Sequence, residues 1–435
     1  MLLSPSTGSS LRRTAIRVAV VSCLAVALGR PVLGQSSSVS TTVQTAAPYT
    51  LGRLVRQALT DNPSIQSRMG DVRAAGFDLE GAQWGRYPSL TGEVQARDGA
   101  QAVLQLQQPL WTGGRVDNQI SLATENRDAA VAAVREAEQQ VLLQVGVGFF
   151  EILRLDARIG IAVENVTEHR RLLEMIQRRV RAEVSPIADE TLAASRMQQA
   201  ISERLQFERA LEAARVTLEQ ASGASLRAGL AAPGRLPDPP TDETQAIESA
   251  LDHSGERERL KVLIRATRAQ AELARSNTKP TIFAAVRQQI GPLQFGQDRT
   301  LAFLGMEFRP GPGLSVLSAV EAAASRVATA EQAVFTHERQ LVQQVRSAWA
   351  EWLAQRQQIE PVRKIARASD EVVSSYLRQY QVGRKTWLDV LNAQRESTQA
   401  RYALADLEWG IQAVRMRLVL LSGIVDSRSI DTLGP

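Results

Sequence analysis

The sequence predicts an α+β membrane protein that contains two copies of one structural unit, each with long helices and a β-hairpin. The chain begins like an exported protein, and its second half repeats the first with an offset of about 200 residues. In each copy, helical periodicity gives way to two runs of period two and then returns. Each run is about ten residues long, which is the length of a tilted transmembrane strand.

Residues 1–34 have the layout of a secretory signal peptide. A basic segment precedes an apolar, uncharged run, and a Ser/Thr-rich flexible segment follows at 35–47. The apolar run is too short to cross a membrane, which favours cleavage over the alternative of a membrane anchor. The sequence before Cys23 also resembles a lipoprotein box, so lipidation of Cys23 is a second alternative.

The leader accounts for most of the positive charge. It carries four arginines and no acid, so the formal net charge of +5 falls to about +1 in the mature chain. This balance gives no reason to expect a nucleic-acid partner. Because Cys23 is the only cysteine, the mature chain is expected to have no disulfide and no thiol chemistry.

The sequence contains no recognisable catalytic or cofactor-binding motif. His169, His253 and His337 lie far apart and form no ligand cluster, so we expect no metal site and no cofactor. No nucleophile–histidine pair, glycine-rich phosphate loop or carboxylate pair occurs in a supporting context. We therefore predict that the protein is not an enzyme.

An internal duplication sets the domain organisation. Phe149 matches Trp349 and Asp189 matches Asp389, both at an offset of 200 residues. Upstream the offset falls to 192, because the second copy has extra residues within its hairpin. The chain thus divides into repeats at 48–228 and 241–425, a Pro/Gly-rich linker at 229–240 and a tail at 426–435.

Each repeat is predicted to contain the same elements in the same order. A first helix, at 51–86 or 244–278, ends before a proline that cannot continue it. A hairpin follows, then a long helix of coiled-coil periodicity and a second helix that ends at a glycine. The predicted hairpins span 89–110 and 281–309, the long helices 115–182 and 315–382, and the second helices 186–222 and 386–422.

The predicted strands are amphipathic. Leu90, Gly92 and Val94 alternate with Thr91 and Glu93, as on a strand with one apolar and one polar face. Four strands in one chain cannot close a barrel, and open edges are not tolerated in lipid. Three chains provide twelve strands, so we expect a homotrimer in contact with outer-membrane lipid.

Two segments carry a resemblance to a known family. One is QPLWTGGR at 108–115, after the first hairpin, and the other is YQVGRKTWLDVLNAQR at 380–395. Together with the duplication, they make residues 48–425 resemble the TolC family of outer-membrane factors. The resemblance implies a trimeric channel, with a twelve-strand β-barrel in the outer membrane and a helical tunnel in the periplasm. It also implies a periplasmic adaptor (membrane fusion) protein and an inner-membrane RND or ABC pump as partners, in efflux or type I secretion.

The resemblance further implies a periplasmic gate. Asp389 matches an aspartate that rings the narrowest point, and Asn392 stands where a second aspartate ring can occur. Tyr380 and Lys385 match residues that tie the inner coil shut, and Asp189 matches the partner of the tyrosine. We therefore expect a hydrogen bond between Tyr380 and Asp189, and a cation-sensitive entrance at Asp389.

The turns between the paired helices are expected to dock the adaptor. Their residues are Ser185 and Pro186 in the first repeat and Gly383 and Arg384 in the second. Alternatively, Ser185 is simply the N-cap of the second helix, with Pro186 at its first position. Glu183 stands where the family has glycine, so the first turn is expected to differ in geometry.

Several of these residues have simpler interpretations. Thr386 and Asp389 have the spacing of a capping box, and Tyr380 can serve in packing alone. Trp111 and Phe308, near strand ends, are expected at the membrane interface, with packing as the alternative. For the whole chain, the main alternative is an exported periplasmic coiled-coil scaffold or adaptor without a pore. That alternative explains the helices and the duplication but not two equivalent amphipathic hairpins.

Overall fold

The computed structural model describes residues 48–96, 100–234, 236–291, 298–309, 311–427 and 429. These residues belong to one compact unit that spans 46–435. The predicted signal peptide at 1–34, Cys23, the segment at 35–47 and most of the predicted tail lie outside the described residues.

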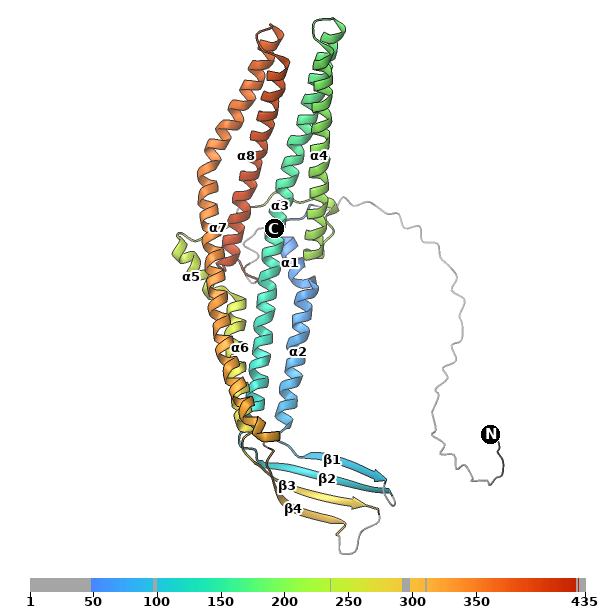
Figure 1. Ribbon diagram of the computed structural model, residues 1–435, viewed down its shortest axis with the longest axis vertical. Coiled ribbons are helices and arrows are strands. Elements are labelled where there is room, and N and C mark those ends of the chain that lie inside the picture. The colour runs from blue at the N-terminus through green and yellow to red at the C-terminus, as the bar shows by residue number, and fades with distance from the viewer. Residues whose placement is uncertain are drawn as a thin grey trace, which may run out of the picture. The chain divides into compact units, whose positions relative to one another are not determined.

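Two long helical hairpins dominate the unit (Figure 1). The first pairs α3 (Arg115–Arg181) with α4 (Ile187–Ser222), and the second pairs α7 (Ser315–Gln381) with α8 (Trp387–Leu421). Both α3 and α7 contain 67 residues, and their starts and ends are 200 positions apart, as the duplication requires. At 1.5 Å per residue, each spans about 100 Å. No helix in the described residues is both long and apolar enough to span a membrane.

The first helix of each repeat is interrupted, so the predictions of single helices at 51–86 and 244–278 are wrong. The first repeat contains α1 (Leu51–Asp61) and α2 (Pro63–Trp84). The second contains α5 (Glu243–His253) and α6 (Gly255–Ser276).

Local chemistry explains both interruptions. Asn62 has a ψ of 122°, because the proline that follows disfavours helical backbone, and its side chain caps α2. In the second repeat, Ser254 accepts the N–H of Arg257 at 3.1 Å and caps α6. Gly255 then approaches α3 so closely that a Cβ would lie 2.8 Å from the Glu136 nitrogen. The break in the second repeat is thus tied to close helix packing.

All four strands form one antiparallel sheet in sequence order. The strands are β1 (Ser89–Ala96), β2 (Ala100–Trp111), β3 (Thr281–Ile290) and β4 (Thr300–Glu307), and β2 pairs with β3 to join the two repeats. Within the described chain, β1 and β4 are the edges and each has one free side. Two short 3-10 helices, η1 (Leu226–Ala228) and η2 (Pro312–Leu314), lie in connections.

The register gives the sheet one apolar and one polar face. Leu90 lies opposite Leu106, and Ile282 lies opposite Met306. This face exposes large apolar side chains from every strand, namely Leu90, Val94, Leu104, Leu106, Ile282, Val286, Ile290, Leu304 and Met306. The alternating positions place Thr91, Glu93, Gln105, Gln107, Arg287 and Glu307 on the other, more polar face, which also carries Phe283, Leu301 and Phe303 of β3 and β4. The predicted alternation of the strands is therefore confirmed.

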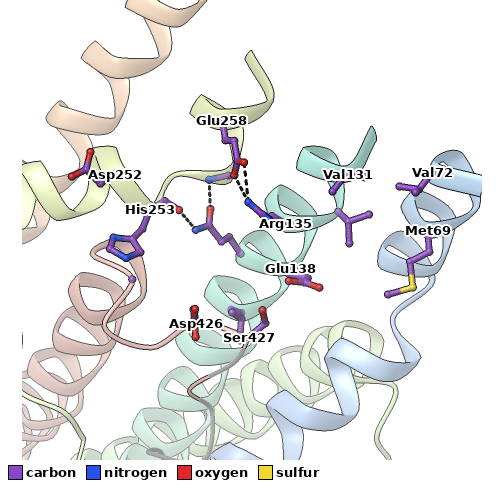
Figure 2. Close-up of a pocket in the computed structure, with 15 residues that line it drawn as sticks. Met69, Val72, Val131, Arg135, Glu138, Asp252, His253, Glu258, Asp426 and Ser427 are labelled. Atoms are coloured by element: carbon purple, nitrogen blue, oxygen red, sulfur yellow. Dashed lines mark hydrogen bonds and ion pairs between the residues drawn. The ribbon is translucent and has the colours of Figure 1, made fainter. Parts of the chain in front are cut away.

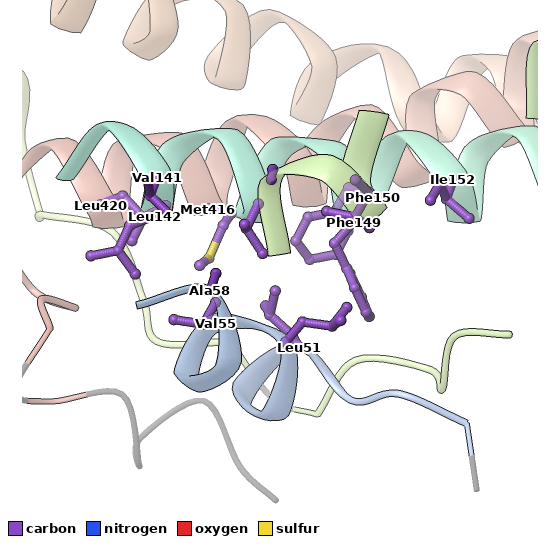
Figure 3. Close-up of a cluster of buried hydrophobic side chains, with 14 of the residues drawn as sticks. Leu51, Val55, Ala58, Val141, Leu142, Phe149, Phe150, Ile152, Met416 and Leu420 are labelled. Carbon is purple, nitrogen blue, oxygen red and sulfur yellow. The ribbon is translucent and has the colours of Figure 1, made fainter. Parts of the chain in front are cut away.

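The largest core lies where α1 packs against α3, midway along the long helices (Figure 3). Phe149 and Phe150 of α3 are almost fully buried, and their rings meet edge to face with centroids 5.5 Å apart. Leu51, Val55 and Ala58 form one face of α1 and join the same cluster. This core anchors the start of the described chain and leaves both ends of the long helices free of it.

Candidate functional site

The candidate site comprises the two turns that join α3 to α4 and α7 to α8, at the end of the helices away from the sheet (Figure 1). We call these turns the helical tips. In the first tip, the Val184 N–H donates to the carbonyl of Arg179 at 2.9 Å, and in the second the Arg384 N–H donates to that of Gln379 at 2.8 Å. Such bonds close a helix that ends in a left-handed residue.

Glu183 and Gly383 occupy the left-handed position of the two tips. Their φ angles are 60° and 77°, and the tip hydrogen bonds are equivalent. The expectation that Glu183 changes the geometry of the first tip is therefore wrong. The backbone of the turn imposes its conformation on a residue that pays about 1–2 kcal/mol for it.

Each second helix begins at a defined cap. Pro186 is the N-cap residue of α4, so the alternative that placed Ser185 in this role is wrong by one position. Thr386 caps α8, and its N–H donates to Asp389 Oδ2 at 3.0 Å while the Asp389 N–H donates to Thr386 Oγ1 at 3.2 Å. The predicted capping box is confirmed. The hydrogen bonds from Thr386, with a smaller contribution from Lys385, hold the pKa of Asp389 below its ordinary value.

Tyr380 is buried between the two hairpins. Its ring centroid lies 5.2 Å from that of Trp387 and 4.9 Å from the guanidinium carbon of Arg179. Its hydroxyl lies 3.3 Å from Ser185 Oγ, which also accepts from Arg179 Nε at 3.3 Å. The expected bond from Tyr380 to the Asp189 carboxylate is not formed within the described chain, where the hydroxyl contacts Ser185 instead.

Asp189 contributes through its backbone instead. Its carbonyl accepts a hydrogen bond from Trp387 Nε1 at 3.1 Å. Trp387 is 2% exposed, and this part-buried bond crosses between α4 and α8. The sequence interpretation missed Trp387 and Arg179. The available signal was Trp387 itself, because a buried indole N–H usually requires an acceptor.

The remaining predicted tip residues are exposed or part-buried. The Lys385 Nζ lies 4.2 Å from the ring centroid of Tyr376, in a cation–π contact. Arg384 is exposed at the tip, and Asn392 is part-buried on α8, one turn after Asp389. The structure thus brings Tyr380, Ser185 and the Asp189 backbone together and leaves the charged groups nearer to solvent.

Comparison with known proteins assigns this fold to a family. The family model described as outer membrane efflux protein matches residues 54–224 and 246–423, which correspond to the two repeats. The chain belongs to the outer membrane efflux protein family. This efflux protein is an outer-membrane channel-tunnel that extends into the periplasm, and the alternative of a scaffold without a pore is not supported.

Relatives of the efflux protein match along nearly its whole length. Outer membrane efflux protein BepC of Brucella suis biovar 1 (strain 1330) is 22% identical over 411 residues, which cover 88% of this chain and 87% of BepC. A crystal structure of a membrane protein from Pseudomonas aeruginosa has a TM-score of 0.74 and 20% identity, covering 86% and 93% of the two chains. The Campylobacter jejuni CmeC outer membrane channel has a TM-score of 0.75 and 12% identity, covering 93% and 95%. The fold is therefore that of TolC-type channels.

Two aromatic side chains of the efflux protein lie where the sheet meets the helices. Trp111 ends β2 and Phe308 follows β4, and about half of each side chain is exposed. A register shift between Pro109 and Trp111 places Trp111 opposite Ile282, on the apolar face. Without this bulge, the regular alternation of side chains along β2 would place the indole of Trp111 on the polar face.

A cavity of about 520 Å³ lies nearer the middle of the efflux protein, between α2, α3 and the start of α6 (Figure 2). Arg135 donates to both carboxylate oxygens of Glu258 at 2.8 Å. The side chain of Gln139 bonds the backbone of His253 and of Gly255. These polar groups hold α3 against the start of α6. In the part of the chain that the structure describes, no group of three or more His, Cys, Asp or Glu is placed to hold a metal ion.

Proposed function

We propose that three copies of this efflux protein assemble into one channel. The two open edges of the four-stranded sheet carry this proposal. β1 and β4 each leave backbone N–H and C=O groups without a strand partner in the described chain, and such groups cannot face lipid. Pairing β4 of one copy with β1 of the next satisfies them, and three copies give an even, closed ring of strands. The apolar face then contacts lipid, while Glu93 and Arg287 on the polar face line the pore.

Disulfide crosslinking tests this assembly, since Cys23 is the only native cysteine and lies in the predicted leader. Thr91→Cys on β1 is combined with Leu301→Cys or Phe303→Cys on β4, all on the polar face. We expect covalent dimers and trimers on non-reducing gels. The control joins Thr91→Cys to Gln105→Cys, which are opposite in one chain and should leave monomers. Monomers alone from both β1–β4 pairs would contradict the trimer.

The helical tips are proposed to form the resting gate. In each copy, Tyr380, Ser185 and Trp387 connect the second hairpin to the first. Asp389 supplies one carboxylate per copy near the entrance, and three like charges around a narrow pore attract cations. Asn392, one turn further along α8, adds no second ring of charge. Opening then requires α8 to separate from α4.

A periplasmic adaptor is proposed to dock on the tips, at Ser185, Pro186, Gly383 and Arg384, and to connect the channel to an inner-membrane RND or ABC pump. Exposed apolar side chains at both tips support this docking. Val184 is 61% and Ile187 is 73% exposed at the first tip, and Val382 is 69% exposed at the second. Apolar groups gathered at the end of an extended protein are typical of a contact surface.

Site-specific photo-crosslinking tests the docking surface. A photoreactive amino acid at Ser185 or Arg384 should capture a periplasmic protein in cells. The matched control carries the same amino acid at Glu248 on α5, far along the chain from both tips. Capture from Glu248 with none from the tips would contradict docking at the tips.

A further inference from the structure

A small polar pocket in the helical wall is not used by the gate or by the tips. It has a volume of about 80 Å³ and lies where α3, α4 and α8 meet. Asn165, His169, Thr398 and Tyr402 form its buried floor. Arg196 of α4 and Arg395 of α8 form part of its more exposed rim.

One buried atom of the floor has no hydrogen-bond partner among the described residues, namely Nδ1 of His169, which is only 5% exposed. The hydroxyl of Tyr402, at the other end of the pocket, interacts with the carboxylate of Glu203. Their neighbours are satisfied, because the Thr398 hydroxyl donates to Asn165 Oδ1 at 2.9 Å. Buried polar groups are normally paired, so the unpaired Nδ1 of His169 indicates that a water or another small molecule binds beside it.

The charge at the rim indicates what kind of molecule that is. Arg196 donates to the neutral Oε1 of Gln199 at 3.0 Å, and neither Arg196 nor Arg395 has a carboxylate partner in the described ranges. The nearest acidic rim residue along α4 is Glu203, which is seven positions from Arg196 and therefore about 10 Å away along the helix. The end of the pocket beside His169 is thus positively charged.

We propose that this end of the pocket binds a small oxyanion, held by the guanidinium groups of Arg196 and Arg395 and by an N–H at His169 Nδ1. A guanidinium presents paired donors in a plane, which fits the oxygens of a phosphate, sulfate or carboxylate better than a halide. The cavity has room for about five water molecules. Inorganic phosphate or a small carboxylate fits this space, whereas a long organic acid does not.

Occupancy of the pocket would join the two hairpins. Arg196 belongs to α4 and Arg395 to α8, and Arg395 lies six residues, or about 9 Å, after Asp389 on the same helix. A shared anion neutralises both guanidiniums and holds α8 against α4. This consequence rests on the proposed gate, whereas the binding itself does not.

Calorimetric titration of the purified full-length protein in detergent tests the binding. Inorganic phosphate, sulfate and acetate are titrated separately at constant ionic strength in chloride. We expect one saturable site per chain, with affinity reduced by about tenfold or more in Arg196→Gln and in Arg395→Gln. Arg209→Gln on α4 and Arg417→Gln on α8 are matched controls outside the pocket and should bind like the wild type. The ranking of phosphate, sulfate and acetate identifies the oxyanion class.

His169 provides a second test that separates binding from folding. His169→Asn keeps an N–H near the position of Nδ1 and should retain affinity within about threefold. His169→Leu should lose binding without a lower melting temperature. The proposal is overturned if no oxyanion binds saturably, if both Arg→Gln rim variants bind like the wild type, or if chloride competes as well as phosphate. Binding without any effect of phosphate on resting conductance would overturn only the link to the gate.

Discussion

The indole Nε1–H of Trp387 donates to the backbone carbonyl of Asp189 at 3.1 Å, and this bond joins the start of α8 to the first turn of α4. Trp387 is buried, and its ring also contacts that of Tyr380. One side chain therefore makes a polar link between the two hairpins and an aromatic contact within the second hairpin, both at the tips. Because the acceptor is a backbone atom, substitution of the Asp189 side chain leaves the link available.

Trp387→Phe removes this hydrogen bond and retains most of the aromatic packing. We expect it to lower the free energy of unfolding by about 1 kcal/mol and to raise the conductance of the resting channel. Denaturant titration and single-channel recording measure the two effects. Trp352→Phe on α7 is the control, since Trp352 is part-buried against Trp349 and lies away from the tips. Equal effects in both variants would show that the Trp387 bond does not hold the tips.

The position of the Tyr380 hydroxyl gives a specific pattern of coupling. Tyr380→Phe and Ser185→Ala each remove one partner of the 3.3 Å contact, so their effects on stability should be non-additive by about 0.5–1 kcal/mol. Tyr380→Phe and Asp189→Ala should add within about 0.5 kcal/mol, since no bond joins these side chains. Double-mutant cycles on the purified protein measure both. Strong coupling of Tyr380 to Asp189, with no coupling to Ser185, would support the Tyr380–Asp189 bond that the family resemblance implies.

The left-handed backbone of Glu183 predicts opposite effects of two substitutions. Glu183→Gly should stabilise the protein by up to about 1 kcal/mol, because relief of the backbone strain exceeds the entropy that glycine loses on folding. Gly383→Glu at the equivalent position should destabilise it by about 1–2 kcal/mol. Denaturation midpoints of both variants give the comparison. A destabilising Glu183→Gly would mean that the glutamate side chain makes contacts that outweigh the strain.

The duplicated sequence pattern was sufficient to predict the order of the elements. The period of the apolar residues and the positions of the glycines located the hairpins and the long helices. The long helices end at Arg181 and Gln381, one residue before the predicted ends. The breaks within the first helices were missed for two reasons. At Pro63 the local signal was present and was overridden by the helical periodicity. At Gly255 a local Ser254 cap is combined with close packing against Glu136 of another helix, and no local pattern contains that packing.

The tips show a similar division between local and tertiary information. The capping box of Thr386 and Asp389 depends on residues three apart and was predictable. The partner of Tyr380 depends on how two hairpins are offset along their axes, and a shift of one helical turn exchanges Asp189 for Ser185. Resemblance to the family supplied the tyrosine but could not supply that offset. The sequence pattern tests His169 only as a metal ligand, because its place beside two arginines depends on the packing of three helices.

Burial of His169 predicts a loss of stability in mild acid. Burial first, and the charge of Arg196 second, lower the pKa of His169 below its ordinary value of 6.5. Below about pH 6.5 the histidine of the unfolded chain binds a proton, whereas His169 in the folded chain stays neutral. The free energy of unfolding therefore falls as the pH drops from about 6.5 toward the lowered pKa of the folded state. Arg196 lines the same pocket as His169, so the charge that lowers this pKa lies beside the buried ring.

Melting temperatures between pH 8 and pH 5, in buffers without phosphate, measure this dependence. His169→Leu should flatten the decline, whereas His253→Gln should leave it in place. An equal decline in the wild type and in His169→Leu would assign the acid sensitivity to other groups.

The capping box at Asp389 allows its two proposed roles to be separated. Asp389→Asn removes the charge but keeps an oxygen that can accept the Thr386 N–H, so the cap is retained. Thr386→Ala removes the hydroxyl that Asp389 N–H uses and leaves the carboxylate in place. If the carboxylates line the pore, Asp389→Asn should weaken block by multivalent cations roughly tenfold, while Thr386→Ala should retain it. Block in bilayer recordings, with cations added on the side of the tips, is the measurement.

The pH dependence of the same block provides an independent check. Hydrogen bonds from Thr386 keep the pKa of Asp389 below its ordinary value of 3.8, so the carboxylate remains ionised as the pH falls toward that value. In the proposed trimer these bonds oppose the rise in pKa that the two neighbouring carboxylates cause, so cation block should be lost only in acid. In Thr386→Ala those bonds are weakened, and the loss of block should move to higher pH. A block that is unchanged in Asp389→Asn would mean that Asp389 caps α8 without lining the pore.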